Sequence, residues 1–140
     1  METLGSLIDK FSISMLRLQN TKPEMVSVVE SQKNDLKNEI DEYLRMALNG
    51  SVRLQEPKFK NYKGENASGI NFNKIGDAVE SLFKSNTTLW NLEDERRDKT
   101  KSDIEIRVIC EDVAKFNRIR NDSMDEINKL LSELINQKKP

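Results

Sequence analysis

The spacing of apolar residues is the feature that most constrains how this chain can fold. Over long stretches with few helix breakers, apolar side chains recur at alternating steps of three and four residues. This period places them on one face of an α-helix, whereas a half-buried strand would need alternate residues. Four segments show it, at about residues 3–19, 22–48, 74–95 and 102–137. We therefore expect an all-α protein.

Short polar connections predict how these segments pair. Residues 20–24 and 96–101 are short enough to make consecutive helices antiparallel neighbours. Thr21 with Glu24, and Ser102 with Glu105, have the spacing of a capping box, in which two side chains satisfy free backbone N–H groups at a helix start. We expect these boxes to open the second and fourth helices.

The stretch between the two hairpins differs from both. It contains Pro57, Gly64 and Gly69 and has no helical period, which indicates a long loop over residues 50–73. The length of 140 residues suits one domain with its own core. We expect a single domain over 1–140, a four-helix bundle with hairpins at 3–49 and 74–137.

The two hairpins are also similar in sequence. Residues 3–9 (TLGSLID) align with residues 74–80 (KIGDAVE). In the second helix of each hairpin, an Asn-Asp pair is followed at matched spacing by Glu-Ile and by Leu, starting from Asn34 and Asn121. We interpret this as a duplicated hairpin with approximate internal two-fold symmetry.

Composition excludes several functional classes. The chain has 23 Lys+Arg against 24 Asp+Glu, so it has no overall positive field for nucleic acid or for an anionic membrane. It contains no histidine, which excludes a Ser-His-Asp triad, a Cys-His dyad and imidazole metal ligands. Its single cysteine, Cys110, excludes an intramolecular disulfide. The fourth helix has an almost unbroken heptad seam of apolar residues from Ile106 to Leu134, and we expect Cys110 to be an inert thiol buried in it.

Other features concern location and association. The apolar runs are too short to span a bilayer, and the first residues lack the pattern of a signal peptide. We expect a soluble cytoplasmic protein that forms a homo-oligomer, with neither a membrane nor a nucleic acid as partner.

Polar residues interrupt the apolar seams. Asn86, Asn117 and Arg120 occupy positions where the pattern calls for leucine or isoleucine, and Lys33 is the counterpart of Arg120 in the first hairpin. A buried charge without a partner costs several kcal/mol, so each should have one. The antiparallel register across residues 96–101 places Glu80 opposite Arg120.

The same register argument gives two further pairings. It places Glu93 opposite Arg107, and in the first hairpin it places Asp9 near Asn34 and Asp35.

These polar residues have two interpretations. They form a structural layer that fixes helix register, as a buried asparagine does in coiled coils. Alternatively, Lys33 and Arg120 converge with Asn86 and Asn117 to hold an anionic group, for which the planar guanidinium is well suited.

Two further motifs were considered as sites. The loop sequence KFKNYK at residues 58–63 alternates basic and aromatic residues, so Lys58, Lys60 and Tyr62 could contact phosphates and stack on bases, or the aromatic rings could anchor the loop. The acids Glu93, Asp94, Glu111 and Asp112 could hold Mg²⁺. Nearby arginines can neutralise those acids, so we expect no metal and no cofactor.

The run LWNLEDERR at residues 89–97, followed by NRIRND at 117–122, resembles the signature of an uncharacterised all-helical bacterial domain family, roughly L-W-x-x-E-D-x-x-R then N-x-x-R-N. Residues 7–13 with 38–41 are similar to small bacterial and phage proteins of the same kind. Members often lie beside polysaccharide-biosynthesis genes, and no activity transfers from them. The matching residues are Asp9, Trp90, Glu93, Asp94, Arg97, Asn117, Arg120 and Asn121.

A more distant resemblance is to the MazG-like nucleotide pyrophosphohydrolases, which are helical bundles with paired glutamates and a Glu-x-x-Asp motif. The acids of this chain do not reproduce that spacing. An Mg²⁺-dependent enzyme is therefore a minor alternative. We expect a non-catalytic protein that binds a small anionic, nucleotide-like or phosphorylated ligand, or else a protein-interaction module, with exposed parts of the stripes (Leu7, Leu16, Phe83, Trp90) docking a partner.

Overall fold

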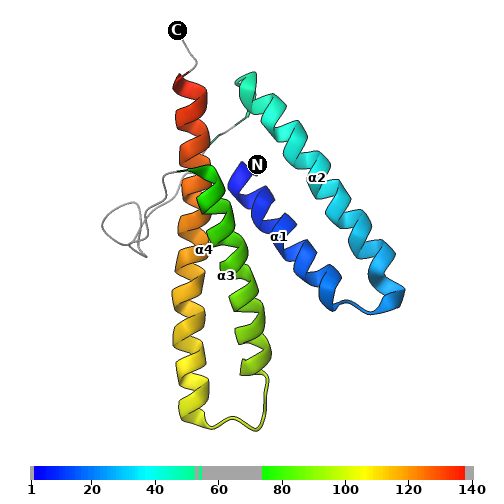
Figure 1. Cartoon of the computed structure of the whole chain (residues 1–140), viewed down its shortest axis with the longest axis vertical. Helices are drawn as coiled ribbons and strands as arrows, with labels where there is room; N and C mark the ends of the chain where they lie inside the picture. Colours follow the sequence, from blue (N-terminus) through cyan, green and yellow to red (C-terminus); the bar gives the residue numbers. More distant parts are fainter. Residues whose placement is uncertain (1, 53, 55–73, 138–140) are drawn as a thin grey trace.

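The computed structural model describes residues 2–52, 54 and 74–137, and these residues fold as an all-α bundle (Figure 1). The helices are α1 (Leu4–Asn20), α2 (Val26–Leu48), α3 (Ile75–Arg96) and α4 (Asp103–Gln137), and a 3₁₀ turn, η1 (Pro23–Met25), precedes α2. The predicted all-α class and the two antiparallel hairpins are confirmed. None of the described helices is both long and apolar enough to cross a lipid bilayer.

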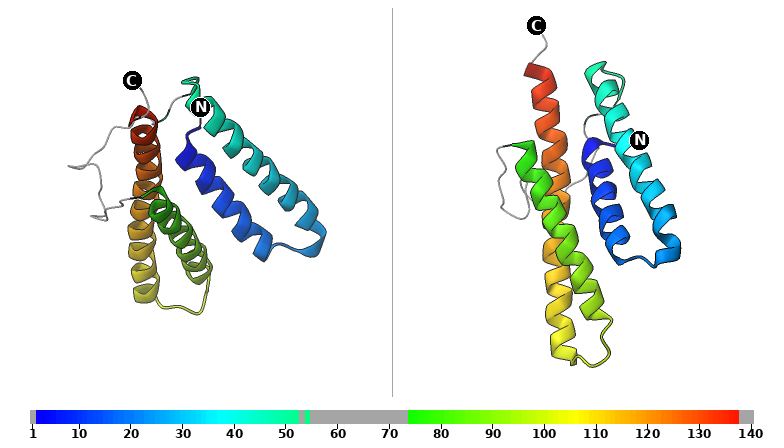
Figure 2. Two further views of the ribbon diagram at one scale, coloured as in Figure 1. Left: turned by 45° about the horizontal axis from the view of Figure 1, so that its top comes forward. Right: turned by 45° about the vertical axis from the view of Figure 1, so that its right-hand side comes forward.

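The first helix joins the two hairpins. α1 packs on α2 and also on both α3 and α4, whereas α2 packs chiefly on α1. Figure 1 shows α1 and α2 leaning away from α3 and α4 toward the turn between α1 and α2. The α3–α4 hairpin is longer and extends beyond the first hairpin in every ribbon view (Figures 1 and 2).

The core lies where one end of each helix meets the others. Its buried residues come in pairs from the start of α1 and α3 and from the end of α2 and α4. They are Leu4, Leu7, Tyr43, Ala47, Ala78, Leu82, Ile127 and Leu131. The core therefore joins the two hairpins at this end of the bundle.

A close approach between α1 and α4 completes this end of the bundle. A Cβ atom on Gly5 would lie only 2.5 Å from the carbonyl oxygen of Met124. Gly5 N–H donates to Oδ1 of buried Asn128 (2.8 Å), and Nδ2 of Asn128 donates to Oγ1 of Thr3 (3.1 Å). A side chain of α4 thus satisfies a free N–H in the first turn of α1.

The helix starts follow the predicted caps in one case only. Ser102 and Glu105 form the expected capping box at α4. The prediction for Thr21 and Glu24 is wrong, because Pro23 opens the separate turn η1 and α2 begins afterwards at Val26 without a side-chain cap. The sequence analysis missed a capping box at α1, formed by Thr3 and Ser6.

The seam predicted for α4 is displaced at both ends. Cys110 is exposed rather than buried, and Leu134 is 52% exposed, whereas Ile109 is buried. A strict seven-residue pattern drifts by about 20° per heptad around a straight α-helix, so over four heptads it leaves the buried face.

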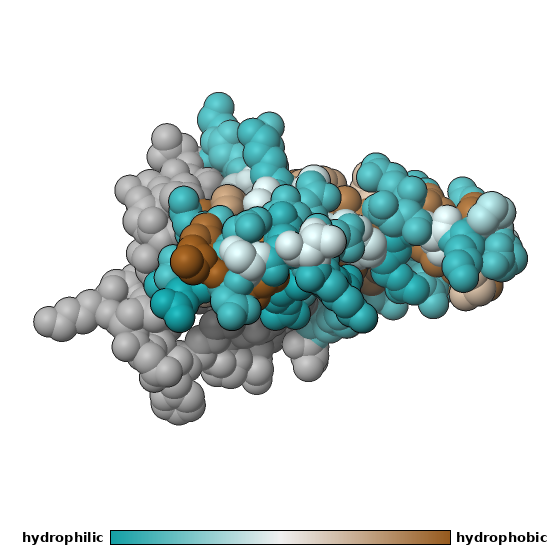
Figure 3. All heavy atoms as spheres, turned by 90° about the horizontal axis from the view of Figure 1, so that it is seen from below, coloured by the Kyte–Doolittle hydropathy of each residue, from teal (hydrophilic) through white to brown (hydrophobic). Residues whose placement is uncertain are grey.

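Hydrophilic residues dominate the surface that Figure 3 shows, and hydrophobic residues form separate small patches between them.

Candidate ligand-binding site

A buried carboxylate connects three helices. Asp9 of α1 is 5% exposed and accepts hydrogen bonds from Nε (2.8 Å) and Nη2 (2.6 Å) of Arg120 on α4. Nδ2 of Asn86, on α3, donates to Oδ1 of Asp9 (2.9 Å) and to Oγ of Ser12 (3.3 Å). We call Asp9, Ser12, Asn86 and Arg120 the Asp9 cluster. It contains Asn86 and Arg120 of the interrupted seams, but neither Asn117 nor Lys33.

The electrostatics of the cluster keep the arginine charged. Hydrogen bonds with Asp9 raise the pKa of Arg120 above its ordinary value, burial lowers it, and the negative charge of Asp9 raises it further. The paired geometry is the two-bond arrangement that guanidinium and carboxylate groups favour. Asp9 therefore holds Arg120 in one orientation.

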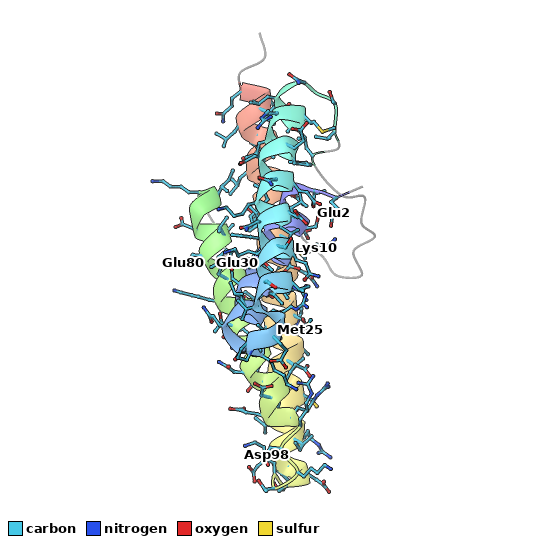
Figure 4. All side chains as sticks on the ribbon, turned by 90° about the vertical axis from the view of Figure 1, so that its right-hand side faces the viewer. Glu2, Lys10, Met25, Glu30, Glu80 and Asp98 are labelled. Atoms are coloured by element: carbon cyan, nitrogen blue, oxygen red, sulfur yellow. The ribbon has the colours of Figure 1, made fainter. Side chains whose placement is uncertain are left out.

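The partners within the cluster differ from those predicted. Glu80 does not face Arg120, because it lies on the outer surface of α3 and pairs with Lys84 of the same helix (3.3 Å; Figure 4). Asp9 does not meet Asn34 or Asp35, which are both exposed. The register within each hairpin left out the packing between the hairpins, in which Asp9 of α1 faces α3 and α4.

The other predicted pairing is also replaced. Glu93 binds Arg96 (2.7 Å), three residues along the same helix, rather than Arg107 on α4.

A pocket of about 330 Å³ adjoins the Asp9 cluster, within the usual size range of small-molecule sites. It lies between α1, α3 and α4. Its apolar lining consists of Ile13, Leu16, Leu89 and Trp90, and its polar lining consists of Asn86, Glu93, Asp94, Arg97, Asn117 and Arg120.

Several polar atoms on the pocket wall are available to a ligand. Asp9 occupies Nε and one N–H of Nη2 in Arg120, while Nη1 forms no hydrogen bond with any described residue. Asn117 is half-buried and likewise makes no hydrogen bond within the part of the chain described, and Oδ1 of Asn86 accepts none there. The wall thus presents free donors and acceptors beside apolar surface.

The pocket brings together four of the predicted ligand-binding residues. Asn86, Asn117, Arg120 and Trp90 line it together, although they were selected from seam interruptions and from the family-like motif. Glu93, Asp94 and Arg97 of that motif also line it.

Six other predicted positions lie elsewhere or outside the described residues. Lys33 lines a separate groove with Phe11, Met15 and Leu18, so its predicted convergence with Arg120 is wrong. Glu80 and Asn121 are exposed and do not line the pocket. The loop candidates Lys58, Lys60 and Tyr62 lie outside the described residues.

The sequence analysis missed Ser12, Ile13, and Leu89 as site residues. Helical spacing could have found two of them, because Ser12 is one turn from Asp9 and Leu89 is one turn from Asn86. This helical spacing identifies site residues only when α1 is already known to face α3.

The acidic residues do not assemble into a metal site in the described structure. Glu93 and Asp94 are engaged by Arg96 (2.7 Å) and Arg97 (3.6 Å). Residues 2–52, 54 and 74–137 contain no group of three or more His, Cys, Asp or Glu side chains placed to hold a metal ion. Glu111 and Asp112 therefore do not join Glu93 and Asp94 in such a group.

Comparison of the chain with protein-family models, curated protein sequences and solved structures finds no match.

Proposed function

We propose that the chain is a non-catalytic binding protein that holds a small anionic molecule, nucleotide-like or otherwise phosphorylated, in this pocket. The observation that supports the proposal is the hydrogen bonding of the Arg120 guanidinium. Arg120 lines the pocket; Asp9 binds Nε and Nη2 on one edge of its guanidinium, whereas Nη1 on the other edge forms no hydrogen bond with the described residues. That edge can donate two parallel hydrogen bonds to a phosphate or carboxylate.

The rest of the wall supports a ligand with an apolar or aromatic portion. Trp90 is half-buried and lies with Leu16 and Leu89 in the lining, where an indole can pack against a planar ring. Because Asp9 already orders Arg120, binding loses little of the rotamer freedom that a mobile arginine would lose. Asn117 supplies an additional donor and acceptor.

Native mass spectrometry of gently purified protein tests this proposal. We expect the wild-type chain to retain a reproducible extra mass, or to gain one after incubation with a mixture of nucleotides and sugar phosphates. The Asn117→Leu variant should lose at least 90% of the adduct, because leucine fills the pocket and removes both polar atoms. Asn121→Leu is the matched control, since Asn121 is exposed on the same helix; it should retain the adduct.

The same spectra also test a second candidate function, which is that of a protein-interaction module in which the Asp9 cluster is purely structural. The observation that favours it is an exposed apolar pair one turn apart on α4, Ile104 (77% exposed) and Val108 (51% exposed). A whole-number oligomer without any adduct would support the module and reject the ligand proposal. An adduct that persists in Asn117→Leu would place the ligand outside this pocket.

A further inference from the structure

We infer that the molecule held in this pocket is an elongated zwitterion, with one anionic group at Arg120 and an ammonium group at Glu93 and Asp94. This inference rests on the proposed function only for the site and for the anionic group at Arg120, and it adds that the ligand also carries a cationic group. It follows from the charges on the pocket wall, from the carboxylate oxygens that remain free there, and from the distance between the two ends.

The pocket carries no surplus of positive charge. Two arginines, Arg97 and Arg120, and two acids, Glu93 and Asp94, line it. The nearest charges outside the lining also cancel, because Asp9 binds Arg120 and Arg96 binds Glu93. A diphosphate or triphosphate would bring several negative charges toward two carboxylates without matching cations, which is unfavourable.

The acidic end of the pocket has unused acceptors. Glu93 uses Oε2 for Arg96, and its side chain is 31% exposed; Asp94 uses Oδ1 for Arg97, and its side chain is 65% exposed. The second oxygen of each carboxylate, Oε1 in Glu93 and Oδ2 in Asp94, forms no hydrogen bond with a described residue. An ammonium group has three donors and no acceptor, so it suits the free carboxylate oxygens at this end of the pocket.

The geometry of α3 sets the separation of the two ends. Asn86 and Arg120 share Oδ1 of Asp9, so the guanidinium lies at the level of Asn86 along the helix. Glu93 follows seven residues later, about 10 Å along the axis at 1.5 Å per residue, and its side chain leans back toward the helix N-terminus. The charged ends of the ligand should therefore be roughly 6–10 Å apart.

This separation selects among zwitterions. An α-amino acid is too short, because a single carbon atom separates its ammonium and carboxylate groups. An ω-amino acid of about six carbons, or a short peptide with apolar side chains, has suitable ends. The body of such a molecule would lie on the apolar lining, between Leu16 and Ile13 of α1 and Leu89 and Trp90 of α3.

Trp90 provides the assay, because it is the single tryptophan of the chain and lines the pocket. Its fluorescence is recorded while the full-length protein is titrated with glycine, 4-aminobutanoate, 6-aminohexanoate and 8-amino-octanoate. Hexanoate and hexylamine serve as single-charge controls, and AMP, ATP and inorganic phosphate serve as anion probes. Isothermal titration calorimetry with the same compounds checks each dissociation constant.

We expect 6-aminohexanoate to bind about two- to fivefold more tightly than hexanoate, which is the range for one partly exposed ion pair. Glycine should not compete with it. The double variant Glu93→Gln/Asp94→Asn should remove the advantage of 6-aminohexanoate while hexanoate binds as well as before or better. Glu95→Gln is the control, because Glu95 is exposed and does not line the pocket.

The other outcomes separate this inference from the proposed function. If hexanoate binds as tightly as 6-aminohexanoate, or if AMP or ATP binds more tightly than every zwitterion, the inference is overturned and the anionic-ligand proposal stands. The same applies if the advantage survives in the Glu93→Gln/Asp94→Asn variant. If none of the probes binds by either method, both are overturned.

Discussion

Replacing Asp9 with alanine should lower the stability of this protein more than replacing most of its other polar residues. The side chain of Asp9 is 8% exposed and accepts hydrogen bonds from Arg120 and from Asn86. Removing one member of a buried ion pair commonly costs about 3–5 kcal/mol. The side chain of Arg120 is 30% exposed and can partly rehydrate, so we expect the lower end, about 3 kcal/mol.

Replacing the other member of the ion pair, Arg120, should destabilise the protein at least as much. Arg120→Ala leaves the Asp9 carboxylate, which is only 8% exposed, without its cation, and we expect a loss of about 4 kcal/mol. Because the two residues contact each other, the double variant should cost less than the sum, with a coupling free energy of about 1.5 kcal/mol or more.

Urea denaturation followed by circular dichroism measures these free energies. With a slope of about 2 kcal/mol per molar urea, Asp9→Ala should lower the midpoint by about 1.5 M. Glu80→Ala is the control, since its ion pair with Lys84 is exposed and is worth less than about 0.5 kcal/mol. A midpoint within 0.2 M of wild type for Asp9→Ala (roughly the shift expected of a surface pair) would refute the reasoning. Additive losses in the double variant would do the same.

Two further predictions concern other parts of the fold. Gly5→Ala should destabilise the protein by about 1–3 kcal/mol, because its Cβ would meet the backbone of Met124. Gly76 is at the aligned position of α3, where a Cβ meets open space, so Gly76→Ala should be neutral or stabilising by up to about 1 kcal/mol. Equal effects of the two substitutions in thermal melts would argue against the close approach of α1 and α4. Burial raises the pKa of Tyr43 above its ordinary 10.0, and a hydrogen bond with the backbone of Leu4 acts in the opposite direction. The folded state therefore favours the neutral phenol, and its contribution to stability is complete below pH 10 and is lost as the pH rises through the raised pKa. Ultraviolet titration should show this late ionisation and its disappearance in Tyr43→Phe; ionisation at or below the ordinary value would contradict the buried position.

The helices could be predicted from sequence because their signals are local. The period of apolar residues and the polar turns gave all four helices of the described structure to within a few residues, apart from the start of α2. There Pro23 formed a separate turn, and the spacing of Thr21 and Glu24 was a chance match to a cap. The fixed heptad misplaced Cys110 because the error in helical phase accumulates along a helix as long as α4.

The residues that line the site could be predicted from the sequence more fully than the contacts that they make. Asn86, Asn117 and Arg120 stood out because polar residues in an apolar seam need a reason to be there. Asp9, the partner of Asn86 and Arg120, comes from α1, and the contact depends on packing between the hairpins, through Gly5 and Asn128, which no short-range pattern encodes.

The sequence repeat was a misleading guide to the site. It aligned Lys33 with Arg120, and it correctly aligned the N-cap residues Thr3 and Lys74. The environments of the aligned residues differ, however, because α1 lies between α2 and the second hairpin. Lys33 therefore faces a different groove from the one that Arg120 lines.

The most direct test of a ligand site at Arg120 is a ¹H–¹⁵N correlation spectrum recorded with and without the retained molecule or a nucleotide. We expect the indole N–H signal of Trp90 and the Nε–H signal of Arg120 to shift together in a saturable manner, with the same dissociation constant. The side-chain amide of Asn121 should stay in place. If saturating ligand leaves the Trp90 and Arg120 signals unmoved, the pocket is not the binding site and the central claim is contradicted.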